Sequence, residues 1–231
     1  MASPADAFDR RNLLTYASLL GGVAAVAAAS RHHPNVAGVA IALSVVADTF
    51  DGRFARRFGA DPRRTALGVE LDSLSDAIAF GIAPPLSSAL LLNAGTGLAD
   101  SALWAAVFVH AACAVTRLAS YNLGAMGGDL APTKPRSGEG GKPVGADGGL
   151  GPPKPVGRGG FIGIPVPLAA LIWATALLVQ PSAAATTMLI MVTAAAMVLP
   201  LRIPRPTGAA LVAFTLWALA VACLHATTLW R

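Results

Sequence analysis

Long apolar blocks, separated by short polar or basic stretches, dominate the pattern along this chain. Uncharged runs of alanine, leucine and valine of about 20 residues are typical of helices that lie in lipid. The pattern therefore predicts an all-α fold, a polytopic transmembrane helical bundle of about six core helices plus a C-terminal seventh. The expected segments are Leu13–Ala29, Val36–Phe50, Thr65–Leu92, Ala99–Leu123, Phe161–Val179, Ala183–Leu199 and Gly208–Leu229.

Composition supports this class. The chain is 55% hydrophobic and only 13% charged, whereas a soluble domain carries roughly 25% charged residues. Its net charge is +5, but the basic residues lie between the apolar blocks, where lipid headgroups would be, and not along one stripe. We therefore expect membrane lipid as a partner and no nucleic acid.

The basic residues also predict an orientation. If the N-terminus is cytoplasmic, the outer ends of the segments hold only Arg31 and Arg231, and nearly all other arginines and lysines lie inside. We expect a multi-pass integral membrane protein with its N-terminus and active site on the cytoplasmic side. Arg10 and Arg11 before an apolar run also resemble a twin-arginine signal peptide, but the apolar chain that follows favours a membrane anchor.

One stretch differs in kind from the rest. Residues 124–160 are rich in glycine, proline and lysine and almost lack large apolar residues. This composition predicts a flexible cytoplasmic loop within residues 1–231, which we otherwise expect to form a single membrane domain.

Five acidic residues interrupt the apolar pattern. Asp48, Asp51, Glu70, Asp72 and Asp76 fall within 29 positions that are otherwise largely apolar, although a charge near the bilayer centre costs at least about 2.5 kcal/mol. The first two aspartates are three positions apart and the last two are four apart, so each pair shares one helix face. Two antiparallel helices would therefore bring four aspartates together.

A short basic link, residues 56–65, joins the two aspartate pairs. Within it, Asp61 and Pro62 are typical of a helix start, with a capping side chain followed by proline at the first helical position. The second aspartate helix is therefore expected to begin there.

Four converging carboxylates favour a divalent metal site. Oxygen ligands suit Mg²⁺, Mn²⁺ or Ca²⁺, and a two-ion cluster can hold a phosphoryl group. The absence of histidine and cysteine from this cluster argues against zinc. Gly52, Ala55 and Gly68 are small enough for a ligand to approach the backbone, and Arg56 could meet a phosphate.

Together these residues read Asp48-x2-Asp51-Gly52-x2-Ala55-Arg56-x11-Gly68-x3-Asp72-x3-Asp76. This pattern is similar to the signature of the CDP-alcohol phosphatidyltransferase family, although the spacer of 11 residues is longer than is usual there. The flanks, residues 12–15, 70–84, 117–122 and 161–165, resemble the membrane-embedded phosphatidylserine synthases of that family. Ser120 stands where that group usually has a second arginine.

The resemblance implies a metal-dependent enzyme that transfers a phosphatidyl group from CDP-diacylglycerol to L-serine and releases CMP. It also implies a homodimer. Two ions of Mg²⁺ or Mn²⁺ would be held by Asp48, Asp51, Asp72 and Asp76, and Asp76 would also be the catalytic general base. The CDP site would be lined by Asp51, Gly52, Ala55, Arg56 and Gly68.

Arg117 and Asn122 are the candidates implied for the acceptor or a lipid phosphate. Arg117 lies near a span end and is equally compatible with an interfacial anchor. His110 and His225 lie within apolar segments, and we interpret both as structural or interfacial.

Two kinds of alternative stay open. A related enzyme would use glycerol phosphate, inositol phosphate or another alcohol as acceptor, or an archaeal-type lipid donor. A protein of a different class, a cation transporter, would use the aspartates as ion ligands at membrane depth. Transport leaves the fixed spacing of Gly52, Ala55 and Arg56 unexplained.

Overall fold

The computed structural model describes residues 8–59, 62–92, 97–127, 161–200, 202–203 and 206–230. Two short strands, β1 (Phe161–Ile162) and β2 (Arg202–Ile203), pair antiparallel. The helices are η2 (Arg10–Asn12), α1 (Leu13–Ala29), α2 (Pro34–Ala55), η3 (Arg56–Phe58), α3 (Pro62–Asp76), η4 (Ala77–Ile82), α4 (Ala83–Leu92), α5 (Leu98–Gly127), α6 (Val166–Ala176), α7 (Ala183–Val198) and α8 (Ala209–Leu229).

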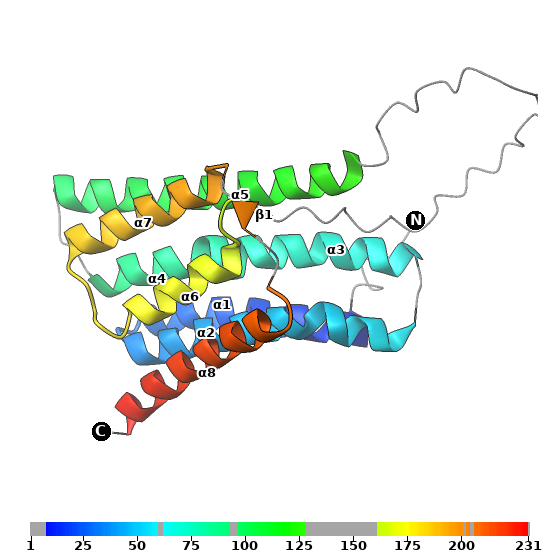
Figure 1. Ribbon diagram of the computed structural model, residues 1–231. Helices are drawn as coiled ribbons and strands as arrows, with labels where there is room; N and C mark the ends of the chain where they lie inside the picture. Colours follow the sequence, from blue (N-terminus) through cyan, green and yellow to red (C-terminus); the bar gives the residue numbers. More distant parts are fainter. Residues whose placement is uncertain are drawn as a thin grey trace, which may run out of the picture.

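The predicted helical bundle is confirmed. Since α3, η4 and α4 follow one another without a gap, the described residues contain seven helical segments besides the short turns η2 and η3. Figure 1 shows α1, α2, α3 and α5 running along roughly one direction, with α8 oblique to them. Five are long and apolar enough to cross a membrane: Arg10–Ala29, Pro34–Phe58, Arg64–Leu92, Leu98–Asn122 and Ala209–Leu229. The chain is therefore a multi-pass integral membrane protein.

Two predicted spans contain helices that are too short to cross the hydrocarbon. The segment predicted over Phe161–Val179 contains only the 11 residues of α6, because β1 and the extended backbone of Pro165 precede it. The segment predicted over Ala183–Leu199 contains the 16 residues of α7, which begins after the capping side chain of Ser182. Neither reaches the length of about 20 residues that crosses the hydrocarbon, and both cover only part of the bundle's length (Figure 1).

Two sequence predictions fall partly outside the residues that the structure describes. Pro62 is the first residue of α3, as its sequence position predicts, whereas Asp61 lies outside the described residues. The loop predicted over 124–160 begins later than expected, because α5 continues to Gly127. The rest of that loop, residues 128–160, lies outside the described part of the chain.

The long third helix changes its winding directly after Asp76. Residues 77–82 form the π-helical segment η4, in which the backbone N–H of Ala83 bonds to the carbonyl of Ile78, five residues earlier. Proline at position 85 cannot donate the α-helical bond to the carbonyl of Gly81. His110 of α5 lies with its Nδ1 at 3.0 Å from that carbonyl oxygen and takes this place. His110 therefore has a structural role at the irregular segment.

Helix α2 is at the centre of the packing. It contacts α1, α6 and α8, whereas α5 packs against α7 and η4. Much of the buried core consists of alanine, and small residues let helices approach closely in a membrane. Large apolar side chains such as Leu20, Phe108 and Leu216 are exposed, as expected of surfaces that contact lipid.

A buried histidine joins three helices. His225 of α8 lies with Nδ1 at 3.0 Å from Oδ1 of Asn35 in α2 and with Nε2 at 2.8 Å from the carbonyl oxygen of Ala174 in α6. The ring packs directly on Gly38, where an added Cβ would overlap it. Position 38 therefore admits no side chain while His225 is present.

We expect Gly38→Ala to destabilise the fold, because the new methyl group meets the His225 ring. Overpacking of this kind costs about 1–3 kcal/mol. The check is the thermal unfolding midpoint in detergent. In a His225→Ala background the same Cβ has room, so Gly38→Ala should cost clearly less there. Equal losses in both backgrounds would show that the ring does not set the requirement for glycine.

Candidate active site

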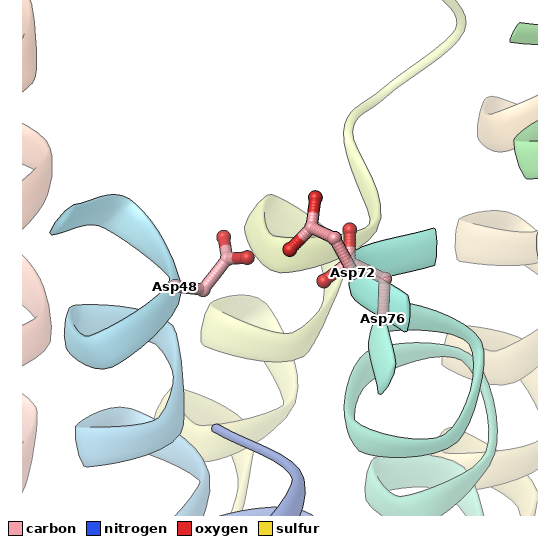
Figure 2. A group of neighbouring side chains, drawn as sticks. All are labelled: Asp48, Asp72 and Asp76. Carbon is pink, nitrogen blue, oxygen red and sulfur yellow. The ribbon is translucent and has the colours of Figure 1, made fainter. Parts of the chain in front are cut away.

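Three aspartates from two helices converge at one point of the bundle. One carboxylate oxygen from each of Asp48, Asp72 and Asp76 lies within 4.8 Å of the others. Figure 2 shows Asp48 on α2 pointing across a gap towards Asp72 and Asp76 on α3. All three are partly buried, so their mutual repulsion is screened less than it would be on an exposed surface.

The donor set fits a divalent cation. Oδ1 of Asp76 is buried and accepts no hydrogen bond, and the Asp48 and Asp76 carboxyl groups lie within hydrogen-bonding reach of each other. Two carboxylates this close require a shared proton or a cation between them. Because every donor is an oxygen, the residues present fit Mg²⁺ or Mn²⁺.

Asp51 has a somewhat different place from the one its spacing suggests. It lies outside the group of three converging oxygens, although its carboxyl group interacts with that of Asp72. The Thr15 hydroxyl of α1 donates to its Oδ2 at 3.3 Å, and its Oδ1 accepts the backbone N–H of Gly52. Asp51 therefore borders the cluster on the side that faces α1.

A pocket of about 540 Å³ opens beside the aspartates. It is enclosed by the N-terminal part of the chain, the end of α2, η3 and the first half of α3. Its lining residues are Arg11, Asn12, Thr15, Asp51, Gly52, Ala55, Arg56, Gly59, Arg64, Thr65, Gly68, Val69 and Asp72. All five residues predicted for the CDP site are among them.

Gly52 lines this pocket, and the packing of the surrounding protein does not require glycine at this position. A Cβ added there would meet only Nη1 of Arg56, at the ordinary contact distance of 3.7 Å. The space above the backbone is therefore available to a ligand, which agrees with the close approach predicted from the sequence.

The two candidates for the acceptor site reach α3 from α5, which contributes nothing to the pocket. Arg117 is buried and interacts electrostatically with Asp76 and Tyr121. Nδ2 of Asn122 donates a hydrogen bond of 2.9 Å to the hydroxyl of Ser73, next to Asp72. Arg117 is therefore not an exposed interfacial anchor, and its charge acts on Asp76.

The polar face of α1 is the main part of the site that sequence reasoning missed. Asn12, Thr15 and Ser18 are all buried, and Asn12 and Thr15 line the pocket. Their spacing of three in an otherwise apolar helix was the available signal, because polar residues at that spacing share one helix face.

Comparison with known proteins agrees with this geometry. The profile of the CDP-alcohol phosphatidyltransferase family matches residues 11–199, most of the chain. The chain belongs to that family. The matched region contains Asp48, Asp51, Asp72 and Asp76, the residues that line the pocket, and helices α1 to α7.

Relatives of this family member carry a more specific name. Proteins named CDP-diacylglycerol–serine O-phosphatidyltransferase from Mycobacterium leprae and from Mycobacterium tuberculosis strain H37Rv are each 38% identical to it over 109 residues. The matches cover 47% of this chain and 34% and 36% of those proteins. A protein of the same name from Helicobacter pylori strain 26695 is 32% identical over 112 residues, 48% of this chain and 45% of that protein. The chain thus covers about a third to a half of the length of these relatives.

We expect Asp72→Asn to weaken Mn²⁺ binding to the purified protein at least tenfold, because even indirect partners of a metal ligand contribute that much. Glu70→Gln is the matched control, since Glu70 is exposed on the same helix and lies outside the cluster. Titration followed by electron paramagnetic resonance measures both. Equal affinities in the two variants would contradict a metal site at the aspartates.

Proposed function

We propose that this protein is a CDP-diacylglycerol–serine O-phosphatidyltransferase, which moves a phosphatidyl group from CDP-diacylglycerol to L-serine and releases CMP. The observation that carries the proposal is the convergence of Asp48, Asp72 and Asp76 beside a pocket lined by the remaining signature residues. The family supports phosphatidyl transfer, and the names of the relatives support serine as the acceptor.

The pocket suits the nucleotide part of the donor. A volume of about 540 Å³ lies within the range of roughly 300–1,000 Å³ that small-molecule sites occupy. We assign CDP binding to Asp51, Gly52, Ala55, Arg56 and Gly68. The exposed Arg56 can pair with a diphosphate through two parallel N–H groups, a geometry that suits phosphate oxygens.

We assign metal binding to Asp48, Asp51, Asp72 and Asp76, with two ions of Mg²⁺ or Mn²⁺. When bound, the ions would neutralise the phosphoryl oxygens and the charge that develops on the departing CMP. The chain's own contribution is to hold the carboxylates on two helices that are packed from several sides, so that little rearrangement is required during the reaction.

In the proposed reaction, the hydroxyl oxygen of serine attacks the phosphorus that carries the diacylglycerol. A new P–O bond forms to serine, and the bond from this phosphorus to the bridging oxygen breaks. CMP departs with the bonding electron pair. Asp76 accepts the hydroxyl proton as the general base.

The acceptor would enter from the α5 side. Arg117 lies close enough to Asp76 to interact with it, and Asn122 is held beside Asp72 through Ser73. A guanidinium and an amide at these places suit the carboxylate of serine or a lipid phosphate. Donor and acceptor would then approach the aspartates from different helices, as transfer between two substrates requires.

The distribution of charge supports an orientation in the membrane. Arg10, Arg11, Arg56, Arg57 and Arg64 surround the pocket end of the bundle, and cytoplasmic ends of membrane proteins are enriched in arginine and lysine. We therefore place the N-terminus and the active site on the cytoplasmic side. The homodimer implied by the family resemblance stays a prediction.

We expect purified protein to release CMP from CDP-diacylglycerol with serine as the acceptor, and at most slowly with glycerol phosphate or inositol phosphate. A panel of these acceptors in the presence of Mn²⁺ or Mg²⁺ measures this. Release with another alcohol but not with serine would overturn the serine assignment and keep the transferase. Metal flux through vesicles without any CMP release would favour a cation transporter instead.

We expect Asp76→Asn to lower kcat by about a thousandfold, within the range that loss of a general base produces, while CDP binding is largely kept. Asp100→Asn in the first turn of α5 is a control for the same chemical change away from the pocket. Turnover and CDP affinity are measured on both variants. Near-normal turnover of Asp76→Asn would contradict the general-base role.

A further inference from the structure

Three arginines line the pocket, and the family signature accounts for only one of them. Arg56 belongs to the signature, whereas Arg11 precedes α1 and Arg64 lies in the first turn of α3. Arg11 and Arg64 are distant in sequence and meet at the same rim. A rim with three guanidinium groups produces a positive potential that attracts an anionic ligand.

The carboxylate of Asp9 contacts both Arg11 and Arg64. Oδ2 of Asp9 lies 2.7 Å from Nη1 of Arg64 and 3.9 Å from Nε of Arg11. Asp9 Oδ1 also accepts the backbone N–H of Arg11 at 3.3 Å. Asp9 itself does not line the pocket, so it fixes the two side chains without occupying the space that a ligand needs.

Arg11 is held by a second contact as well. Its Nη2 donates to the carbonyl oxygen of Phe58 at 2.9 Å, and the neighbouring Arg10 lies 5.8 Å above the Phe58 ring. The residues before α1 are thereby fastened to η3. At the edge of the pocket, Arg11 is thus bound to η3 and Arg64 extends from α3. Asp9 contacts both arginines from outside the pocket.

We propose that Arg64, together with Arg11, binds the anionic diphosphate of the nucleotide donor at the pocket rim, and that Asp9 is the positioning residue for both. This inference rests on the proposed function. A guanidinium carries five N–H donors in a rigid fork that suits phosphate oxygens, and Arg64 lines the pocket while its Nη1 pairs with Asp9. Preorganised donors of this kind reduce the entropy cost of binding.

The ion pair is present under ordinary conditions. The hydrogen bond from Arg64 lowers the pKa of Asp9 below its usual value. A carboxyl group with a lowered pKa keeps its charge at neutral pH, and its pair is lost only as the pH falls through the lowered value. The positioning contact therefore holds across the range in which binding would be measured.

The first test measures the affinity for CDP by titration calorimetry in the presence of Mn²⁺. We expect Arg64→Gln to weaken CDP binding about tenfold or more, the loss typical of a charge-assisted hydrogen bond to phosphate. Arg57→Gln is the matched control, because Arg57 is exposed, lies next to Arg56 in the sequence and does not line the pocket. It should bind CDP within about twofold of the original protein.

The kinetic signature separates binding from catalysis. An anchor that contacts the donor equally in the ground and transition states changes KM and not kcat. Arg64→Gln should therefore raise KM for CDP-diacylglycerol and leave kcat and the KM for the acceptor nearly unchanged. Arg64→Lys, which keeps the charge and loses the fork, should recover part of the affinity.

The second test addresses Asp9. Asp9→Asn keeps a side-chain oxygen that can cap η2 and accept from Arg64, and it removes only the charge. We expect CDP binding about threefold weaker, and partial recovery in Asp9→Glu. In an Arg64→Gln background the same change should cost less, because its main target is gone.

Several outcomes would overturn the inference. Equal CDP affinities of Arg64→Gln and Arg57→Gln would show that Arg64 does not bind the diphosphate. Tighter CDP binding by Asp9→Asn than by the original protein would show that Asp9 competes with the diphosphate for the arginines. Mn²⁺ affinity reports whether the aspartate cluster is intact in each variant. If Arg64→Gln lost the binding of both CDP and Mn²⁺, that variant would be misfolded, and Arg64→Lys would be the test instead. Arg64→Lys with normal Mn²⁺ affinity and unchanged CDP affinity would then contradict the role of the Arg64 fork. If the unaltered protein bound no CDP at all, the proposed function itself would fail.

Discussion

The mutual repulsion of carboxylates inside an apolar bundle is the constraint on which the rest of this structure depends. Asp48, Asp72 and Asp76 bring oxygens within 4.8 Å of one another, and such an arrangement persists only if the helices are fixed by contacts elsewhere and the charge is compensated. Helix α2 has contacts with α1, α6 and α8 for this purpose. The α3 side has Arg117 near Asp76 and the Ser73–Asn122 hydrogen bond to α5. The proposed substrate sites thus surround a group of carboxylates that the scaffold must hold together against their mutual repulsion.

Much of the fold could be predicted because its signals are local. The helices appear as uncharged runs, and the aspartate pairs share a face because three or four residues complete about one turn. The convergence of Asp48 with Asp72 and Asp76 follows once α2 and α3 are antiparallel. What could not be predicted depends on contacts between distant segments. The hydrogen bond between Thr15 and Asp51, the electrostatic interaction of Arg117 with Asp76 and the pairing of Asp9 with Arg64 all join residues that are far apart in the sequence.

The shortened helices α6 and α7 show a different limit. Their apolar character was evident from the sequence, but hydropathy does not show where a helix gives way to an extended backbone. Pro165 and the β1–β2 pairing set that boundary, and a pairing between residues 161–162 and 202–203 spans too much sequence for a local pattern to indicate it. The apolar pattern therefore locates a helix without fixing its ends: α6 is shorter than its predicted segment, whereas α2 and α5 are longer than theirs.

The π-helical segment after Asp76 has a geometric consequence for the helix that contains it. A bond over five residues accommodates one extra residue within a turn, and each residue advances an α-helix by about 100°. The segment η4 therefore determines how far α3, which carries Asp72 and Asp76, is rotated about the helix axis relative to α4. A regular α-helix of the same sequence would rotate Asp72 and Asp76 by about 100° relative to α4. The π-helical segment therefore lets the direction in which the α3 aspartates point differ from the one that the packing of α4 would impose on a regular helix.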